Sequence, residues 1–147
     1  MRFNRRTILR LSLLLGTLLN VTVLEGKVDE TMLTQKQADE VIASGKLKRL
    51  KSKSDFPKIW YREMGLDDMS DVDGSFSVGC TGNEPHTRMI AGAVSEQYGL
   101  LIYEQGGIAY FRNLKLYRRE NNKVECVHSE SVDEARIKSI EGKLRKE

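Results

Sequence analysis

The sequence has few of the side chains that most metal and catalytic sites use. It contains two cysteines and two histidines in 147 residues, and no GxGxxG or P-loop glycine pattern. The cysteine and histidine spacings match no standard zinc finger, and no nucleotide site is implied. There is also no internal repeat of about 20–50 residues and no low-complexity tract, which excludes a repeat architecture.

The first 26 residues have the composition of an export signal. Residues 1–10 hold four arginines and no acid, and the run from Leu11 to Leu24 carries no charge. A cationic head before an apolar run of this length is typical of a signal peptide, whereas a membrane span needs about 20 apolar residues. No cysteine follows the run to serve as a lipid-anchor site, and no A-x-A-like cleavage site is visible.

The stretch Asn4–Arg10 resembles the twin-arginine signal pattern. Arg5 and Arg6 are followed, after one residue, by Ile8 and Leu9. The resemblance implies export of the folded protein, and an ordinary secretory signal is the alternative. By either route we expect a periplasmic or secreted protein with no stable membrane span after processing. The cleavage point stays open, as does the alternative that the apolar run is retained as a membrane anchor.

The basic charge of the chain belongs mostly to this signal. The full sequence has 24 basic and 21 acidic residues and a pI near 8.9. Removing the four arginines and Glu25, which precede residue 27, leaves 20 of each sign. A balanced mature chain gives no reason to expect a nucleic-acid partner.

Residues 27–147 have the length of one domain with a single core. Their pattern predicts an α+β fold, an antiparallel β-meander of about four strands with an N-terminal helical segment and a C-terminal helix. Residues 27–74 form the charged helical segment, and residues 75–147 form the sheet and the last helix. The aromatic stretch 56–61 is expected to dock the first part onto the second.

Two capping patterns predict where helices begin. Thr34 and Gln37 form a capping box, and Gly45 is placed to end the helix that follows. Ser131 and Glu134 form a second capping box, which predicts that the C-terminal helix starts there and runs to about residue 145.

Four runs rich in β-branched, aromatic and leucine residues predict the strands. The turns at 105–107 and 121–122 suit tight hairpins that need positive φ. The period-two pattern of 114–118 predicts one buried face and one wet face. The expected strands are 88–94, 100–104, 108–118 and 123–128.

Three interpretations compete for the cysteines and histidines. The first is a disulfide between Cys80 and Cys126, since two cysteines in an exported domain are most simply partners. The second is a zinc site of Cys80, His86, Cys126 and His128, in which the last two share a strand face because they are two residues apart. The third is a small envelope hydrolase with a Cys80 nucleophile and His86 or His128 as base. We favour the disulfide.

Charged stretches in residues 27–74 give no specific site. The segment 69–74 has a faint likeness to a calcium loop, but Met69 and Cys80 stand where the EF-hand pattern needs acids. A solvated acidic loop is the simpler interpretation. The lysines between residues 46 and 58 are likewise explained as a solvated face.

We therefore expect a non-catalytic exported domain without cofactor or bound metal. Its partner would be a protein or a cell-envelope component, in an inhibitor, immunity or accessory role. The loop of residues 79–88 precedes the first predicted strand, and loops on a rigid sheet often carry binding residues. By position alone, the candidate contact residues are Asn83, His86, Arg88, Glu104 and Tyr110.

Overall fold

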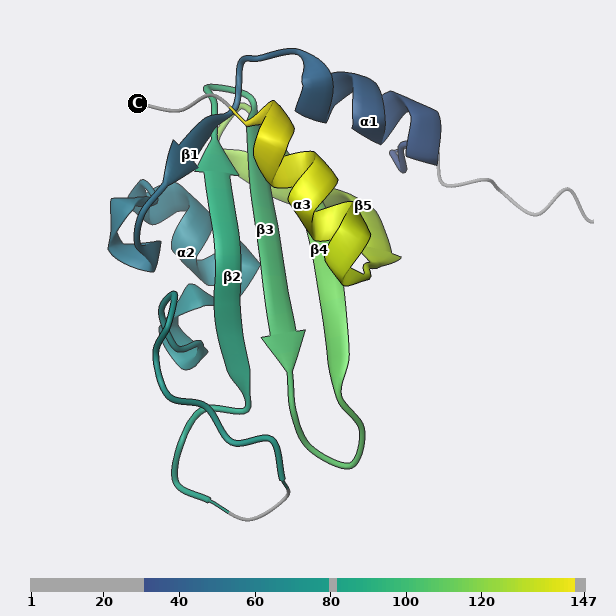
Figure 1. The fold of residues 1–147 in the computed structure, drawn as a ribbon. Helices are drawn as coiled ribbons and strands as arrows, with labels where there is room; N and C mark the ends of the chain where they lie inside the picture. The colour runs from purple at the N-terminus through teal and green to yellow at the C-terminus, as the bar shows by residue number, and fades with distance from the viewer. Residues whose placement is uncertain (1–30, 80–81, 145–147) are drawn as a thin grey trace, which may run out of the picture.

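The computed structural model describes residues 31–79 and 82–144, which form a five-stranded antiparallel sheet with helices on both faces (Figure 1). The predicted α+β meander is confirmed, and the predicted number of about four strands is corrected to five. The strands are neighbours in chain order: β1 (Lys48–Leu50), β2 (Thr87–Val94), β3 (Tyr98–Gln105), β4 (Phe111–Glu120) and β5 (Lys123–Ser131).

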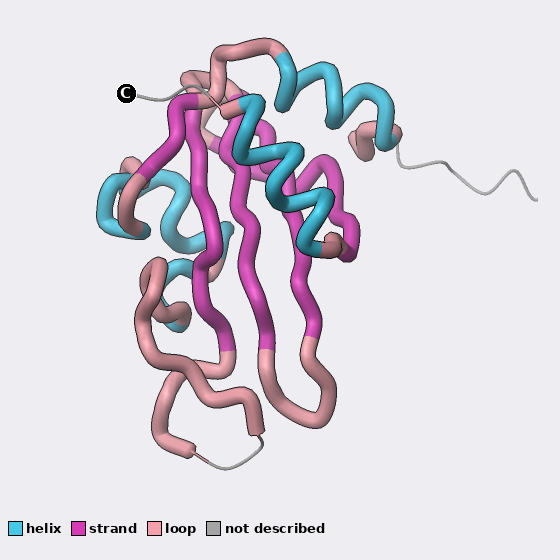
Figure 2. Tube along the Cα trace, viewed as in Figure 1, coloured by secondary structure: helices cyan, strands magenta, loops and turns pink. Residues whose placement is uncertain are grey.

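The additional strand, β1, lies in the lysine-rich segment that was expected to be helical or solvated. Lys48 pairs with Val94, and Leu50 pairs with Gly92 of β2. The neighbouring Leu47 is fully buried. The short apolar–basic alternation of this segment therefore suits an edge strand with one buried face. The tube in Figure 2 shows it as a short strand beside β2.

Helices α1 (Gln35–Ala43) and α3 (Glu134–Lys143) pack on one face of the sheet. The capping box of Thr34 and Gln37 is confirmed, and Gly45 follows α1 with a φ of 69°. The second predicted cap is wrong, because Asp133 caps α3 by accepting a hydrogen bond from the Arg136 backbone N–H at 2.7 Å. Ser131 is instead the last residue of β5.

Helix α2 (Lys58–Met64) and the two 3₁₀ turns Lys53–Asp55 and Leu66–Asp68 cover the opposite face. Phe56 and Trp60 are buried there, so the aromatic stretch docks this segment as expected. Trp60 lies against Gly99 of β3, where an added Cβ would be 2.9 Å from the indole ring. The glycine thus provides the space into which the indole packs.

The central strands are buried on both faces. Leu114 and Leu116 belong to the cluster under α1 and α3, whereas Tyr117 belongs to the cluster under α2. The expectation of one wet face on 114–118 is therefore wrong at Tyr117, which is buried. Helices on both sides of a sheet remove the polar face that an open antiparallel sheet would have.

The two predicted hairpins differ. Asn121 and Asn122 both have positive φ, 47° and 72°, and connect β4 to β5 as a tight turn. The connection from β3 to β4 is instead a five-residue loop, residues 106–110, in which Gly107 has a φ of 130°. Among the described residues, no helix has the length and apolar character needed to cross a membrane.

Candidate functional site

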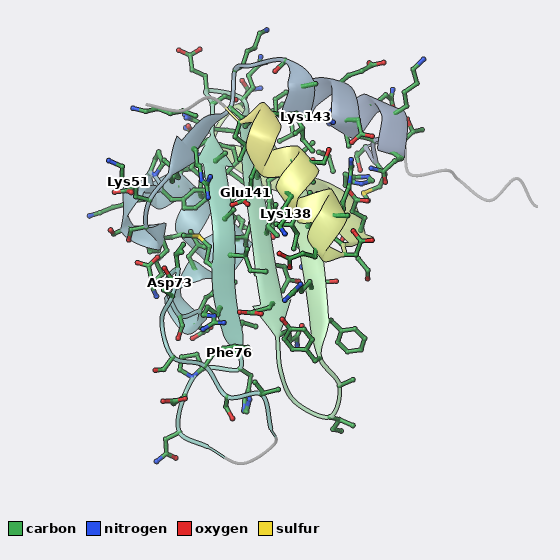
Figure 3. All side chains as sticks on the ribbon, viewed as in Figure 1. Lys51, Asp73, Phe76, Lys138, Glu141 and Lys143 are labelled. Atoms are coloured by element: carbon green, nitrogen blue, oxygen red, sulfur yellow. The ribbon has the colours of Figure 1, made fainter. Side chains whose placement is uncertain are left out.

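Three of the five proposed contact residues meet on one face of the sheet. Arg88 on β2 lies directly opposite Glu104 on β3, which in turn lies opposite Arg112 on β4. This row alternates in charge, so each cross-strand pair is favourable. Side chains on these strands are drawn in Figure 3, where Phe76 is labelled beside the lower end of β2.

Glu104 is the centre of this row and one of two buried polar residues among those described. It is 5 % exposed. Its Oε1 accepts a hydrogen bond from Arg88 Nε at 2.6 Å, and its Oε2 accepts one from the Tyr110 hydroxyl. Arg88 also donates to the Gly74 carbonyl and lies over the Phe76 ring at 4.4 Å. The charge of the buried Glu104 carboxylate is therefore balanced by Arg88, and both of its oxygens accept hydrogen bonds.

Tyr110 links this row to helix α3. Its hydroxyl accepts from Arg112 Nε at 2.9 Å, and Arg112 pairs with Glu134 in the first turn of α3 at 2.8 Å. Burial of the hydroxyl and its hydrogen bond to Glu104 raise the pKa of Tyr110 above its ordinary value of 10.0. The Tyr110 hydroxyl thus stays protonated and can donate a hydrogen bond to the Glu104 carboxylate. The network thus joins β3 and β4 to α3 through hydrogen bonds and an ion pair.

The network lies beside an exposed apolar surface at the end of the sheet. We call this surface the apolar tip and define it as Val78, Ile108, Tyr110 and Phe111. Ile108 is 98 % exposed, and the other three are about half exposed. Among the described residues, the exposed large hydrophobic side chains are these four and Met32.

Backbone hydrogen bonds join the two loops that form the apolar tip. The Gly107 N–H donates to the Val78 carbonyl at 2.9 Å, and the Gly106 N–H donates to the His86 carbonyl at 2.8 Å. The loops approach so closely that a Cβ on Gly106 would lie 2.2 Å from the Ser77 carbonyl oxygen. The position of the apolar tip is therefore fixed by backbone contacts that need glycine.

The remaining two candidate contact residues, Asn83 and His86, lie in the neighbouring loop and are exposed. The structure thus brings His86 next to the hairpin through its backbone, while its imidazole is not part of the charged row. No described contact of the Asn83 side chain ties it to the apolar tip.

The cysteine and histidine pattern is partly outside the described residues, since Cys80 is among those not described. The disulfide therefore stays a prediction. Cys126 is half-buried in the cluster under α2, and burial raises the pKa of its thiol.

Cys126 and His128 do not share a face, contrary to the expectation from their spacing. The register shifts between Leu116, opposite His128, and Tyr117, opposite Cys126. This β-bulge at Val127 turns His128 toward α1 and leaves Cys126 on the α2 face. Within residues 31–79 and 82–144, no group of three metal-ligating side chains is close enough to hold an ion.

His128 serves a packing role at the start of α1. It is buried, and its Nδ1 lies 3.2 Å from the Leu33 carbonyl oxygen, so a proton on Nδ1 is donated there. The Leu33 N–H in turn donates to the Val127 carbonyl. His86 lies at the other end of the sheet, beside Gly106. The two candidate bases of the hydrolase hypothesis thus occupy separate sites.

The acidic loop has a structural role at Asp71. Its carboxylate accepts hydrogen bonds from the Ser52 hydroxyl and from the backbone N–H groups of Lys53 and Val72. Burial alone would raise the pKa of Asp71, but these hydrogen bonds and the Lys53 charge outweigh it and lower the pKa. The Asp71 carboxylate thus joins two loops through hydrogen bonds.

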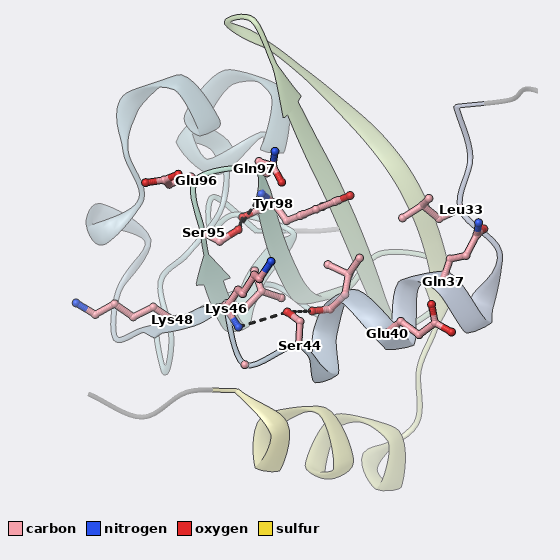
Figure 4. Close-up of a pocket in the computed structure, with 13 residues that line it drawn as sticks. Leu33, Gln37, Glu40, Ser44, Lys46, Lys48, Ser95, Glu96, Gln97 and Tyr98 are labelled. Carbon is pink, nitrogen blue, oxygen red and sulfur yellow. Dashed lines mark hydrogen bonds between the residues drawn. The ribbon is translucent and has the colours of Figure 1, made fainter.

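A groove lies at the end of the sheet opposite the apolar tip. It has a volume of about 1020 Å³ and lies between one side of α1 and the β2–β3 turn (Figure 4). Its apolar lining includes Leu33, Val41 and Tyr98, which also border the main core. Polar side chains surround them, and none of the candidate contact residues lines this groove.

Sequence reasoning did not identify Arg112, Ile108 or Phe111. The alternation of Phe111, Arg112 and Asn113 was visible, but the partner of each arginine depends on strand register. Ile108 was assigned to a strand, so its exposure in a loop was not foreseen. The signal available was the run Ile108–Phe111 directly after two glycines.

Comparison with known proteins gives no functional assignment. No protein-family model matches the chain, and no curated protein or solved structure matches it.

Proposed function

We propose that this chain is an exported, non-catalytic domain that binds another protein or a cell-envelope component through the apolar tip. The observation that carries the proposal is the clustering of exposed hydrophobic side chains. Four of the five in the described residues gather at one end of the sheet, while Met32 is separate. Exposed apolar side chains that gather at one end of a folded domain are typical of interaction sites.

The free energy that burial of these side chains would contribute supports a binding role for the apolar tip. Full burial of an exposed isoleucine or phenylalanine side chain is worth about 1.5–3 kcal/mol. Ile108 is almost wholly exposed, and the other three side chains are about half exposed. Covering the apolar tip would thus contribute on the order of 5 kcal/mol before the costs of association.

The composition of the surface also supports a binding role. Tyrosine, phenylalanine and arginine are enriched in the centres of protein interfaces, and charged groups of both signs are common at their rims. Here the Tyr110 hydroxyl bonds to Arg112, which pairs with Glu134, and Phe111 precedes Arg112 on β4. The charged groups already have partners within the chain, which favours a role in positioning the apolar tip over a role in catalysis.

The test compares two variants of the full chain expressed in its own cells. Ile108→Ser with Phe111→Ser removes the apolar tip, and Met32→Ser removes an exposed hydrophobic side chain elsewhere. After amine-reactive cross-linking of intact cells, we expect a larger complex with the natural sequence and with the Met32 variant. The tip variant should lose it. Equal complex formation by all three would contradict the proposed surface.

Export is measured in the same cells. We expect the protein in the periplasmic or secreted fraction, with a mass that shows removal of the N-terminal signal. Recovery only from the cytoplasm, with all four N-terminal arginines present, would contradict the export part of the proposal.

A further inference from the structure

The apolar tip is positioned before any partner arrives. Two loops are joined by the bonds from Gly106 and Gly107, and the Tyr110 hydroxyl is fixed between Glu104 and Arg112. Such positioning reduces the conformational freedom that binding would otherwise have to remove. The most exposed side chain, Ile108, projects from the middle of the five-residue loop.

We infer that the apolar tip is a preformed convex plug that inserts into an apolar pocket of a protein partner. This inference rests on the proposed function and specifies the partner. The pocket must accept a branched aliphatic side chain together with an aromatic ring. Its rim must face charges of both signs, because the partly exposed Arg88 and Arg112 and the exposed Glu134 flank the plug.

The charge around the plug favours a protein over a lipid surface. Attraction to anionic lipid needs a surplus of basic side chains close to the inserting residues. Arg88 and Arg112 are each paired with a glutamate, and the neighbouring loop adds the exposed Glu84. An apolar centre with a mixed-charge rim is the anatomy of a protein interface.

The area of the plug disfavours a second copy of the same chain. A symmetric contact between two plugs would cover one whole side chain, Ile108, and parts of three others on each copy. A stable interface buries about 800 Å² on each partner. Two convex surfaces of this size do not reach that area, whereas a concave partner can also contact the rim.

The experiment places a benzophenone amino acid at Phe111 in the full chain, with the same probe at Met32 as the control position. Ultraviolet irradiation of living cells then cross-links each benzophenone side chain to the molecule that contacts it. We expect a protein adduct from position 111 at a yield at least tenfold above that from position 32.

Positioning is tested by Gly106→Ala, which keeps every side chain of the plug but forces a Cβ against the Ser77 carbonyl. Gly142→Ala is the matched control, because nothing lies within 4 Å of the added Cβ. With the probe at Phe111, the Gly106 variant should lose at least tenfold in adduct yield and the Gly142 variant should lose none. Circular dichroism and Trp60 emission confirm that both variants are folded. Equal yields would overturn the preformed plug.

Other adducts separate the inference from the proposed function. A lipid adduct from position 111, with flotation of the purified protein on 3:1 phosphatidylethanolamine–phosphatidylglycerol vesicles that Ile108→Ser abolishes, would overturn the protein pocket and leave an envelope-binding function. An adduct with the mass of two copies would also overturn it. Equal adducts from positions 111 and 32 would overturn both the plug and the proposed contact surface.

Discussion

The hydrogen bond between Tyr110 and Glu104 offers a quantitative test of the charged row. Tyr110→Phe removes one hydroxyl and keeps the ring, and Glu104→Gln keeps the shape and removes the charge. A hydrogen bond to a charged group contributes about 1.5–3 kcal/mol. The Tyr110 side chain is 44 % exposed, so we expect the lower end of this range, a loss of about 1.5 kcal/mol.

Glu104→Gln should cost about 2 kcal/mol, because it weakens this bond and the ion pair with Arg88. Arg88 is about a third exposed and recovers part of the loss through water. Tyr110→Phe removes the bond between the hydroxyl and residue 104, and Glu104→Gln weakens the same bond, so the double variant should be less destabilised than the sum. We expect a coupling energy of about 1 kcal/mol.

Urea unfolding followed by fluorescence measures these changes. The chain has one tryptophan, Trp60, which is 1 % exposed and lies on the opposite face from the row. For an m-value of about 1.5 kcal/mol/M, the Tyr110 variant should unfold at about 1 M less urea. Additivity of the two changes within about 0.5 kcal/mol would refute the direct bond, as would an unchanged midpoint for Tyr110→Phe.

The same comparison has a predicted pH dependence. The folded protein raises the pKa of Tyr110 above 10.0, so its proton is retained after the unfolded chain has begun to lose its own. The stability difference between the natural protein and Tyr110→Phe is then fully present below about pH 10 and declines as pH rises past it. A difference that grows above pH 10 would contradict this sign.

Three further predictions follow from other contacts. Gly99→Ala, which brings a Cβ to 2.9 Å from the Trp60 ring, should lower the free energy of unfolding by about 1–3 kcal/mol and shift the tryptophan emission; unchanged values would contradict the close contact. Asp71→Asn should lower stability at pH 7, and the gap should close as pH falls below 3.8 and through the lowered pKa; a gap that persists at pH 2 would count against the carboxylate's role. The intact denatured mass should lie about two daltons under the reduced mass if Cys80 and Cys126 are joined, and alkylation of either thiol without reduction would exclude the bond.

Features governed by local hydrogen bonds were predictable from sequence. The capping box of Thr34 and Gln37 involves residues three apart, and the turn at Asn121 and Asn122 depends on the φ values of two residues. Ser131 shows the limit of such patterns. Ser131 stays in β5 because it pairs with Asn113 of β4, and Asp133 caps α3 instead.

Features governed by strand register were not predictable. The alternation of side chains along β5 is interrupted by a bulge at Val127, which places Cys126 and His128 on opposite faces. No local residue pattern predicts this bulge. In the candidate site, the sequence singles out Arg88, Glu104 and Tyr110 only by their positions near turns. Their meeting depends on three strands in a particular register, which also brings in Arg112.

The division of the core by the sheet has a consequence for the order of folding during translation. The cluster under α2 is drawn from residues between Leu50 and Cys126, whereas the cluster under α1 also needs Ile137, Ile140 and Leu144. While α3 is still inside the ribosomal exit tunnel, the nascent chain can bury Trp60 but must leave uncovered the part of the other face on which α3 packs. Proteolysis of ribosome-arrested chains that end before and after α3 should therefore show the α2 side protected first. Until α3 emerges, that uncovered face is the surface a chaperone would meet.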